Sequence, residues 1–191
     1  GGAVQQRRAV WMQNMAARDN RMMDVVLLQM LSASNTFFAS TSVLLLGGLA
    51  ALLGSGDRVQ GLLEKLPWVA RAPAEVFEVK ILFLMALFIY AFFKFAWAFR
   101  LTHYTAIMIG ATPITNGEVS EDCTAHAAQV AVLAGLSAEH ANTGLRTYYF
   151  AIAGILWFLH PALFMAATTW VLLILMRREF FSRSLRAVTM R

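Results

Sequence analysis

The sequence ILFLMALFIYAFFKFAWAFRLTH, residues 81–103, is one of three long apolar stretches, and the other two run from about 32–54 and 147–176. Each can cross a hydrocarbon layer of roughly 30 Å, which takes about 20 helical residues. A mean hydropathy of +0.59, with 59% hydrophobic and 14% charged residues, is typical of a chain whose solvent is the bilayer. We therefore predict an all-α integral membrane helical bundle with three transmembrane helices.

Length and charge narrow the class further. The 191 residues suit one membrane domain, 1–191. The net charge of +5 comes mainly from basic residues at the ends of the spans, so we expect anionic lipid headgroups, and not nucleic acid, as the counter-charge. A single cysteine, Cys123, excludes an internal disulfide. The chain begins with Gly1-Gly2 and no initiator Met, so we expect an upstream segment, which could hold a further span.

Residues 4–31 are predicted to form an N-terminal amphipathic helix. Trp11, Met15, Met22 and Val26 fall on one face at helical spacing. Such a helix lies on the membrane surface or against a partner more readily than in lipid. A solvated helical lead-in to the first span explains the same pattern equally well.

Capping residues mark two other helices. Pro73 suits the first turn of the second spanning helix, and Gly110 and Pro113 mark its latest end. Ser120 is a suitable N-cap for an Ala-rich helical segment over 120–145. That segment is too weakly apolar to span, and we expect it to pack at one face of the bundle.

The first span is rich in small residues, and we assign helix packing to Ala39, Gly47, Ala51 and Gly54. The first three belong to one i, i+4 row, and Gly54 belongs to a second small-xxx-small pair. Small residues let helix backbones approach closely in lipid, where no hydrophobic force brings helices together. A tight internal interface explains them better than a cofactor site.

Four polar residues within or at the edge of the spans are candidates for contact with a partner or a solute: Lys94, Arg100, His103 and His160. A charge at the bilayer centre costs about 2.5–3.5 kcal/mol on insertion scales. Lys94 lies past the midplane and either extends to one headgroup layer or pairs with an acidic group of a partner. Arg100 and His103 share a helix face and could bind a lipid phosphate, a helix carbonyl or a substrate anion.

The dipeptide His160-Pro161 is the most distinctive local feature. Proline removes the helical hydrogen bond to the Trp157 carbonyl and predicts a kink. A free carbonyl and an imidazole near mid-membrane could serve a proton path, a metal or a haem. The expected depths of His103 and His160 differ, which argues against a shared haem, and a structural histidine bonded to a neighbouring Ser or Thr is the better explanation.

Other signatures of chemistry are missing from the sequence. We find no Gly-rich phosphate loop, no Cys/His metal spacing, no serine nucleophile elbow and no carboxylate pair in the predicted spans. We therefore predict no catalytic residue, no metal, no cofactor and a non-enzymatic protein.

Charge counting leaves the orientation open. Three spans would place seven of the 16 basic residues on one side and nine on the other. Either the topology is weakly driven, or a span folds back at Pro161 as a hairpin. The first helix usually dominates orientation, which slightly favours a cytoplasmic N-terminus.

Several strings, in this order, resemble a known family: RRAVWMQNMAARDNRMMD at residue 7, NTFFASTSVLLLGGLAALLG at 35, YAFFKFAWAFR at 90, GLRTYYFAIAGILWFLHPALF at 144 and RREFFSRSL at 177. Together they are similar to domain-of-unknown-function family 599, which comprises bacterial and plant membrane proteins. The resemblance covers about residues 7–185. It implies a membrane bundle but no activity, substrate, cofactor or site residue. Family members commonly carry a hydrophobic segment before the first string, which supports the expected upstream span.

These observations favour a small non-enzymatic membrane subunit or assembly partner of a larger complex. The expected partners are the bilayer with its anionic lipids and other membrane subunits or further copies of the chain. A transporter or channel using Lys94, Arg100 and His160 is the alternative, and a haem- or quinone-binding redox component is a weaker one. We expect a multi-pass location, in the bacterial inner membrane.

Overall fold

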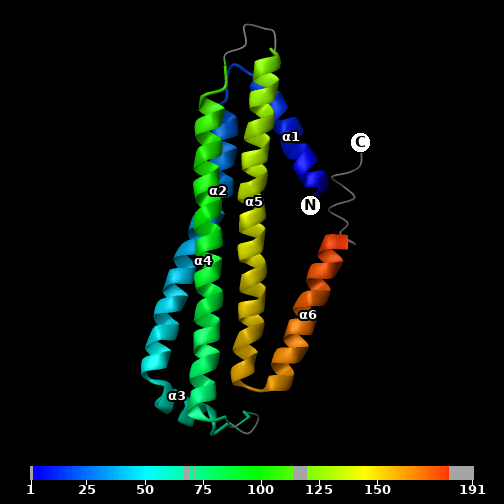
Figure 1. The fold of residues 1–191 in the computed structure, drawn as a ribbon. Coiled ribbons are helices and arrows are strands. Elements are labelled where there is room, and N and C mark those ends of the chain that lie inside the picture. Colours follow the sequence, from blue (N-terminus) through cyan, green and yellow to red (C-terminus); the bar gives the residue numbers. More distant parts are fainter. Residues whose placement is uncertain (1, 67–68, 71, 114–119, 181–191) are drawn as a thin grey trace. The chain divides into compact units, whose positions relative to one another are not determined.

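The computed structural model describes residues 2–66, 69–70, 72–113 and 120–180, except for the side chains of residues 57, 179 and 180. The elements are helices: α1 (Gly2–Ala16), α2 (Met22–Gly54), α3 (Gly56–Leu63), α4 (Ala74–Gly110), α5 (Glu121–Ile155), a 3₁₀ turn (Leu156–Phe158) and α6 (Pro161–Phe180) (Figure 1). Three of them are long and apolar enough to cross a membrane, namely Met22–Gly54, Ala74–Gly110 and Pro161–Arg178. The predicted all-α bundle with three candidate spans is therefore confirmed. The start of α4 directly after Pro73 and its end at Gly110 also agree with the prediction.

The N-terminal helix differs from the expectation of one helix over 4–31. α1 ends at Ala16, and α2 begins at Met22 and continues through the whole predicted first span. The side chain of Asn20 accepts a hydrogen bond from the Met22 N–H at 3.0 Å. Asn side chains that bond nearby backbone in this way compete with the helix and favour its start at a new residue.

The third expected span, 147–176, is also corrected. α5 runs without a break from Glu121 to Ile155, so the predicted 120–145 segment and the start of the predicted span are one helix. Its N-terminus is capped as predicted, since the Cys123 N–H donates to the Ser120 hydroxyl at 3.2 Å. The chain then turns, and α6 runs back in the opposite direction (Figure 1). The hairpin at Pro161 is thus the arrangement present.

Pro161 explains why the helix stops there. A proline has no N–H to donate to the carbonyl four residues earlier, yet its fixed φ suits the first position of a new helix. In the structure Pro161 is the first residue of α6.

The chain divides into two compact units. The first unit comprises 1–37, 95–142 and 179–191, and the second comprises 38–94 and 143–178. The core of the first unit is built from α1 and the adjoining parts of α2, α4 and α5: Met12, Met15, Ala16, Leu28, Ile109, Cys123, Ala127, Val130, Ala131 and Ala134. Polar contacts reinforce it, since the Thr102 and Ser137 hydroxyls lie 2.7 Å apart and Ser137 donates to the Ala98 carbonyl at 2.8 Å.

In the second unit, Tyr148 of α5 joins α2 and α4. Its hydroxyl lies 2.8 Å from the Ser42 hydroxyl and donates to the Phe38 carbonyl at 2.9 Å. Its ring makes edge contacts with Phe38 and Phe88, each at a centroid distance of 5.4 Å. Interhelical hydrogen bonds and close packing are the forces available for holding helices together in lipid.

Candidate functional site

A buried lysine fastens the turn between α5 and α6. The Lys80 side chain is 5% exposed, and its ammonium donates to the Trp157 carbonyl at 3.0 Å. This carbonyl is the one that Pro161 leaves without a helical partner. The Lys80 ammonium thus satisfies a backbone acceptor that the proline would otherwise leave unpaired.

Aromatic rings surround this ammonium. Its nitrogen lies 5.5 Å from the ring centroid of Trp157 and 5.9 Å from that of Phe158, within cation–π range. Phe77 makes an edge contact with Phe158 at 5.2 Å, and the Ala70 N–H donates to the Leu159 carbonyl at 2.9 Å. The turn between α5 and α6 is therefore held by two parts of the chain, helix α4 and the segment that precedes α4.

His160 caps α6 and does not lie in the middle of a span. Its Nδ1 accepts a hydrogen bond from the Ala162 N–H at 3.1 Å, and the side chain is exposed. The first N–H groups of a helix lack internal partners, so this contact satisfies one of them. The carbonyl that proline frees, that of Trp157, is present as predicted, but it accepts a hydrogen bond from the Lys80 ammonium. The His160 imidazole bonds to the backbone of Ala162 and not, as predicted, to a neighbouring Ser or Thr.

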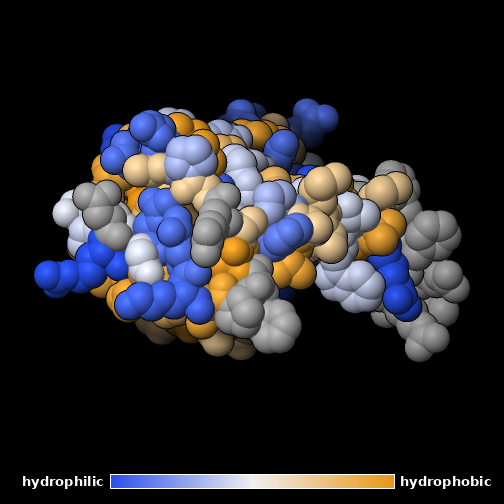
Figure 2. All heavy atoms as spheres, turned by 90° about the horizontal axis from the view of Figure 1, so that it is seen from below, coloured by the Kyte–Doolittle hydropathy of each residue, from blue (hydrophilic) through white to orange (hydrophobic). Residues whose placement is uncertain are grey.

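Figure 2 views the end of the second unit where α3 and this turn lie, and it shows hydrophilic residues among hydrophobic ones. Arg58, Lys65, Glu75 and Glu78 are exposed. Such a mixture is typical of a surface at the boundary between bilayer and water.

An apolar cavity of about 330 Å³ lies between α4, α5 and α6 within the second unit. Its lining consists of Phe83, Leu87, Tyr90, Thr147, Phe150, Phe164 and Thr168. At the turn, Phe164 stacks on Trp157 at a centroid distance of 5.2 Å. Farther along α6, the Thr168 hydroxyl oxygen is buried and has no hydrogen-bond partner among the described residues.

The predicted candidate Lys94 lies one turn beyond this cavity. Its ammonium sits 5.2 Å from the ring centroid of Tyr90, a residue of the cavity wall, and its side chain is half-buried. Lys94 follows Lys80 by 14 positions along α4, a rise of roughly 21 Å at 1.5 Å per residue. Lys94 is therefore far from the turn that carries His160.

Arg100 and His103 lie in the first unit and are exposed. The Arg100 guanidinium donates to the Tyr104 hydroxyl at 2.7 Å and covers its ring. The His103 Nδ1 lies 3.1 Å from the Phe99 carbonyl. Both side chains contact residues of their own helix, so these contacts do not draw the predicted candidates into one site.

The small residues assigned to helix packing face outward within this chain. Gly47, Ala51 and Gly54 are exposed and Ala39 is half-buried. A Cβ added at Gly47 or Gly54 would meet no other described atom within 4 Å. The buried positions of α2 are different ones, namely Asp24, Leu28, Ser32, Asn35 and Ser42.

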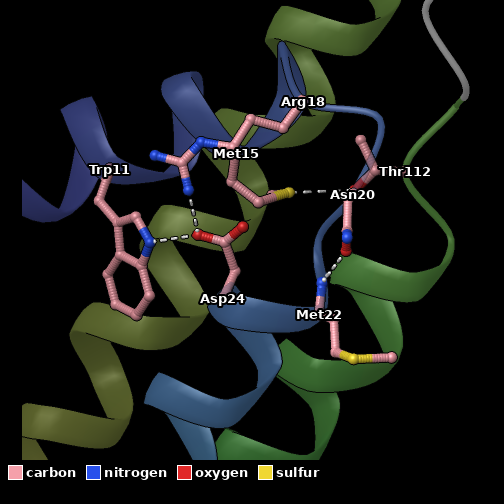
Figure 3. Close-up of polar contacts among 7 residues, drawn as sticks. All are labelled: Trp11, Met15, Arg18, Asn20, Met22, Asp24 and Thr112. Carbon is pink, nitrogen blue, oxygen red and sulfur yellow. Dashed lines mark hydrogen bonds and ion pairs between the residues drawn. The ribbon is translucent and has the colours of Figure 1, made fainter.

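A second buried polar cluster lies in the first unit, around Asp24 (Figure 3). The Asp24 side chain is fully buried, and its Oδ1 accepts hydrogen bonds from the Trp11 indole at 2.7 Å and from Arg18 at 2.9 Å. Its Oδ2 has no partner among the described residues. This carboxylate therefore ties α1 and the following turn to the first helical turns of α2.

Arg21 extends the same region toward α4. Its guanidinium donates to the carbonyls of Thr112 and Pro113 at 2.6 and 2.7 Å. The Thr112 hydroxyl in turn donates to the Met15 sulfur at 3.9 Å (Figure 3). These contacts satisfy the carbonyls of two residues that follow α4, which ends at Gly110.

Sequence reasoning missed both Lys80 and Asp24. A signal existed for each, because each falls in line with buried residues of its own helix. Lys80 lies between Phe77 and Leu84, and Asp24 lies four residues before Leu28. An ionisable residue on a core-facing row must find a partner, since burying an unpaired charge is expensive.

The described residues offer no metal site, since they contain no group of three His, Cys, Asp or Glu side chains that could hold an ion. Cys123 is buried, and its thiol donates to the Ala16 carbonyl at 3.8 Å. That contact makes it a packing residue of the first unit.

Comparison with known proteins agrees with the resemblance of the sequence strings. Neither curated proteins nor solved structures gave a match. A family model described as "Protein of unknown function, DUF599" matches residues 2–184. Because the match covers nearly the whole chain, the protein belongs to the DUF599 family.

Proposed function

We propose that this protein is a non-enzymatic membrane subunit that works in an assembly with other membrane-embedded chains. The observation that carries the proposal is the low burial of two of its three candidate spans. None of the most apolar 18 residues of α6 is buried and 6% of those of α2 are, against 33% for α4. Two spans thus leave most of their surface to lipid or to another chain.

The residues on the exposed face of α2 indicate that this face contacts another protein chain and not only lipid. Gly47, Ala51 and Gly54 lie on it, and positions 47 and 54 have open space around them. Lipid chains pack equally well against large side chains, whereas small residues bring a specific advantage only where a second helix approaches closely. We infer that α2 contributes this face to a helix–helix contact between chains.

The transporter alternative gains no support from the contacts of its candidate residues. Lys94 lies roughly 21 Å along α4 from Lys80, and Lys80 contacts the turn that includes His160. Arg100 contacts a tyrosine of its own helix. We therefore do not propose a solute path through these side chains.

Extraction in mild detergent followed by native mass spectrometry tests the assembly role. We expect a protein mass above that of one 21.2 kDa chain, made up either of further copies or of a second membrane protein. The double variant Gly47→Leu/Gly54→Leu should fall apart to single chains because the added side chains hold the partner helix away. A single chain of wild-type protein, with no companion, would overturn the proposal.

The matched control is Leu45→Ala. Leu45 lies on the same helix and is 37% exposed, but it does not belong to the row of small residues. This variant should assemble like the wild type. If it dissociates as readily as the glycine variant, the small-residue face has no special role.

A further inference from the structure

The cavity between α4, α5 and α6 is suited to an apolar chain. Five of its lining residues are aromatic or aliphatic, and only Thr147 and Thr168 add hydroxyls beside that of Tyr90. Thr147 already donates to the Thr143 carbonyl at 3.0 Å. The Thr168 hydroxyl, which has no partner in the described part of the chain, could pair with one polar group, but further polar groups of a solute would stay unpaired here, at a cost of a few kcal/mol for each. Its volume of about 330 Å³ is at the lower end of the range of ligand pockets.

The two ends of the cavity differ. At the turn, the stacked rings of Trp157 and Phe164 lie at 5.2 Å, and the Lys80 ammonium is engaged by the Trp157 carbonyl. The opposite end is therefore the one at which a ligand's polar group has to lie.

Two basic residues, Lys94 and Arg146, lie at the end of the cavity away from the turn. Lys94 follows the lining residue Tyr90 by one helical turn, and Arg146 precedes the lining residue Phe150 by one turn. Within the second unit α4 and α5 run in opposite directions (Figure 1), so one turn forward on α4 and one turn back on α5 lead to the same end. Arg146 is exposed and Lys94 is half-buried.

We propose that this cavity binds one acyl chain of an anionic phospholipid, whose phosphate is held between Lys94 and Arg146. An apolar chain fills the aromatic space, and the two positive charges at its open end attract the negatively charged phosphate. A zwitterionic lipid offers the same chain, but its own positive group weakens the attraction of the two cations. The proposal depends on the helices being in the bilayer and is independent of the assembly role.

Native mass spectrometry of the detergent-purified chain tests the proposal with two added probes, phosphatidylglycerol and phosphatidylcholine of identical acyl chains. We expect the wild type to retain the anionic lipid about tenfold to thirtyfold more strongly, since a basic residue near the surface contributes about a factor of five. The double variant Lys94→Gln/Arg146→Gln should lose this preference and still bind both lipids weakly through the chain.

Three further variants separate the parts of the site. Arg100→Gln removes an exposed cation of the same helix away from the cavity and should keep the preference. Lys94→Arg with Arg146→Lys keeps both charges and should also keep it. Thr168→Phe fills the cavity and should weaken retention of both lipids alike.

Elution as a single sharp species establishes that each variant is folded. Equal retention of the two lipids by the wild type would overturn the proposal, as would a preference that survives in the Lys94→Gln/Arg146→Gln variant. Organic extraction that yields a stoichiometric quinone from the native protein would also overturn it, because the cavity would then belong to a redox molecule. Loss of assembly with lipid preference intact would overturn only the proposed function.

Discussion

Lys80 shows how a single side chain allows a proline within an apolar stretch. Pro161 ends one hydrogen-bond ladder, and the carbonyl that loses its partner accepts a bond from an ammonium 77 residues earlier in the chain. The same ammonium lies against two aromatic rings. Neither contact involves an acidic residue. The Lys80 ammonium is therefore stabilised by a backbone carbonyl and by cation–π contacts.

This arrangement predicts the effect of Lys80→Met. The substitution keeps the apolar stem but leaves the Trp157 carbonyl without its donor, which costs about 1–3 kcal/mol for a buried group. Thermal unfolding in detergent should therefore occur at a lower temperature. Lys65→Met, at an exposed position, is the control and should unfold like the wild type. Equal unfolding temperatures for all three proteins would contradict the assigned role of Lys80.

Asp24 performs a similar task in the first unit. Asp24→Ala removes the acceptor of Trp11 and Arg18, and a hydrogen bond to a charged group is worth about 1.5–3 kcal/mol. We expect faster hydrogen exchange of the α1 amides, because α1 loses its tie to α2. Asp19→Ala removes an exposed carboxylate close by and should leave α1 exchange unchanged. Unchanged exchange in Asp24→Ala as well would show that apolar packing alone holds α1.

At the scale of the helices, two glycines with the same helical backbone have opposite surroundings. A Cβ at Gly154 of α5 would lie 2.8 Å from a methyl of Leu84 on α4, whereas a Cβ at Gly47 of α2 would meet nothing described within 4 Å. Gly154 therefore permits the close approach of α4 and α5. Gly47 would permit the close approach of a helix from another chain, because no helix of this chain approaches it among the described residues.

The pair gives a matched test with one substitution. Gly154→Val should lower the free energy of unfolding by about 1–3 kcal/mol, because overpacking forces neighbouring side chains or backbone to shift. Gly47→Val should leave the stability of the isolated chain nearly unchanged and should weaken only its assembly. Chemical denaturation of the detergent-solubilised chain measures the first effect. Comparable losses at both positions would mean that sterics between α4 and α5 are not the cause.

At the scale of the whole molecule, the hairpin between α5 and α6 changes how many basic residues the topology assigns to each side of the membrane. Besides the short α3, the second unit contains four long helical segments of alternating direction. Helix α3 and the turn at 156–160 therefore lie at one end of the unit, and residues 38, 94, 143 and 178, where the chain enters or leaves it, lie at the opposite end (Figure 1). In the sequence, four of the 16 basic residues fall in the range 55–80, which the hairpin topology assigns to this side: Arg58, Lys65, Arg71 and Lys80. By chain order, the same topology assigns the remaining twelve (16 − 4) to the other side.

This bias predicts the orientation, because cytoplasmic segments carry the excess of Lys and Arg. In a Cys123→Ser background, Arg58→Cys should react with a membrane-impermeant thiol reagent added outside intact cells. Arg177→Cys should react only after the cells are opened. Labelling of both positions from outside, or of Arg177→Cys alone, would contradict the predicted topology.

Sequence reasoning predicted the helical membrane class, three candidate spans, the capping of α5 by Ser120 and the start of α4 after Pro73. These features depend on composition, apolar length and backbone chemistry, which act over a few neighbouring residues. It did not predict that residues 4–31 form two helices, and it assigned 147–176 to one span with a hairpin at Pro161 only as an alternative, whereas these residues are the end of α5, a turn and the reversed helix α6. Asn20 and Pro161 are compatible with both arrangements, since each can be accommodated in a kinked continuous helix or can begin a new one.

Only the tertiary structure decided which polar residues are buried and which partner each one has. Lys80 and Trp157 are 77 residues apart, and Tyr148 meets Ser42 across 106. Whether α2 turns its small residues or its Ser and Asn row inward depends on the surfaces that α4 and α5 present to it. Such choices minimise the free energy of the whole bundle, and the local pattern of apolar residues is nearly the same for each of them.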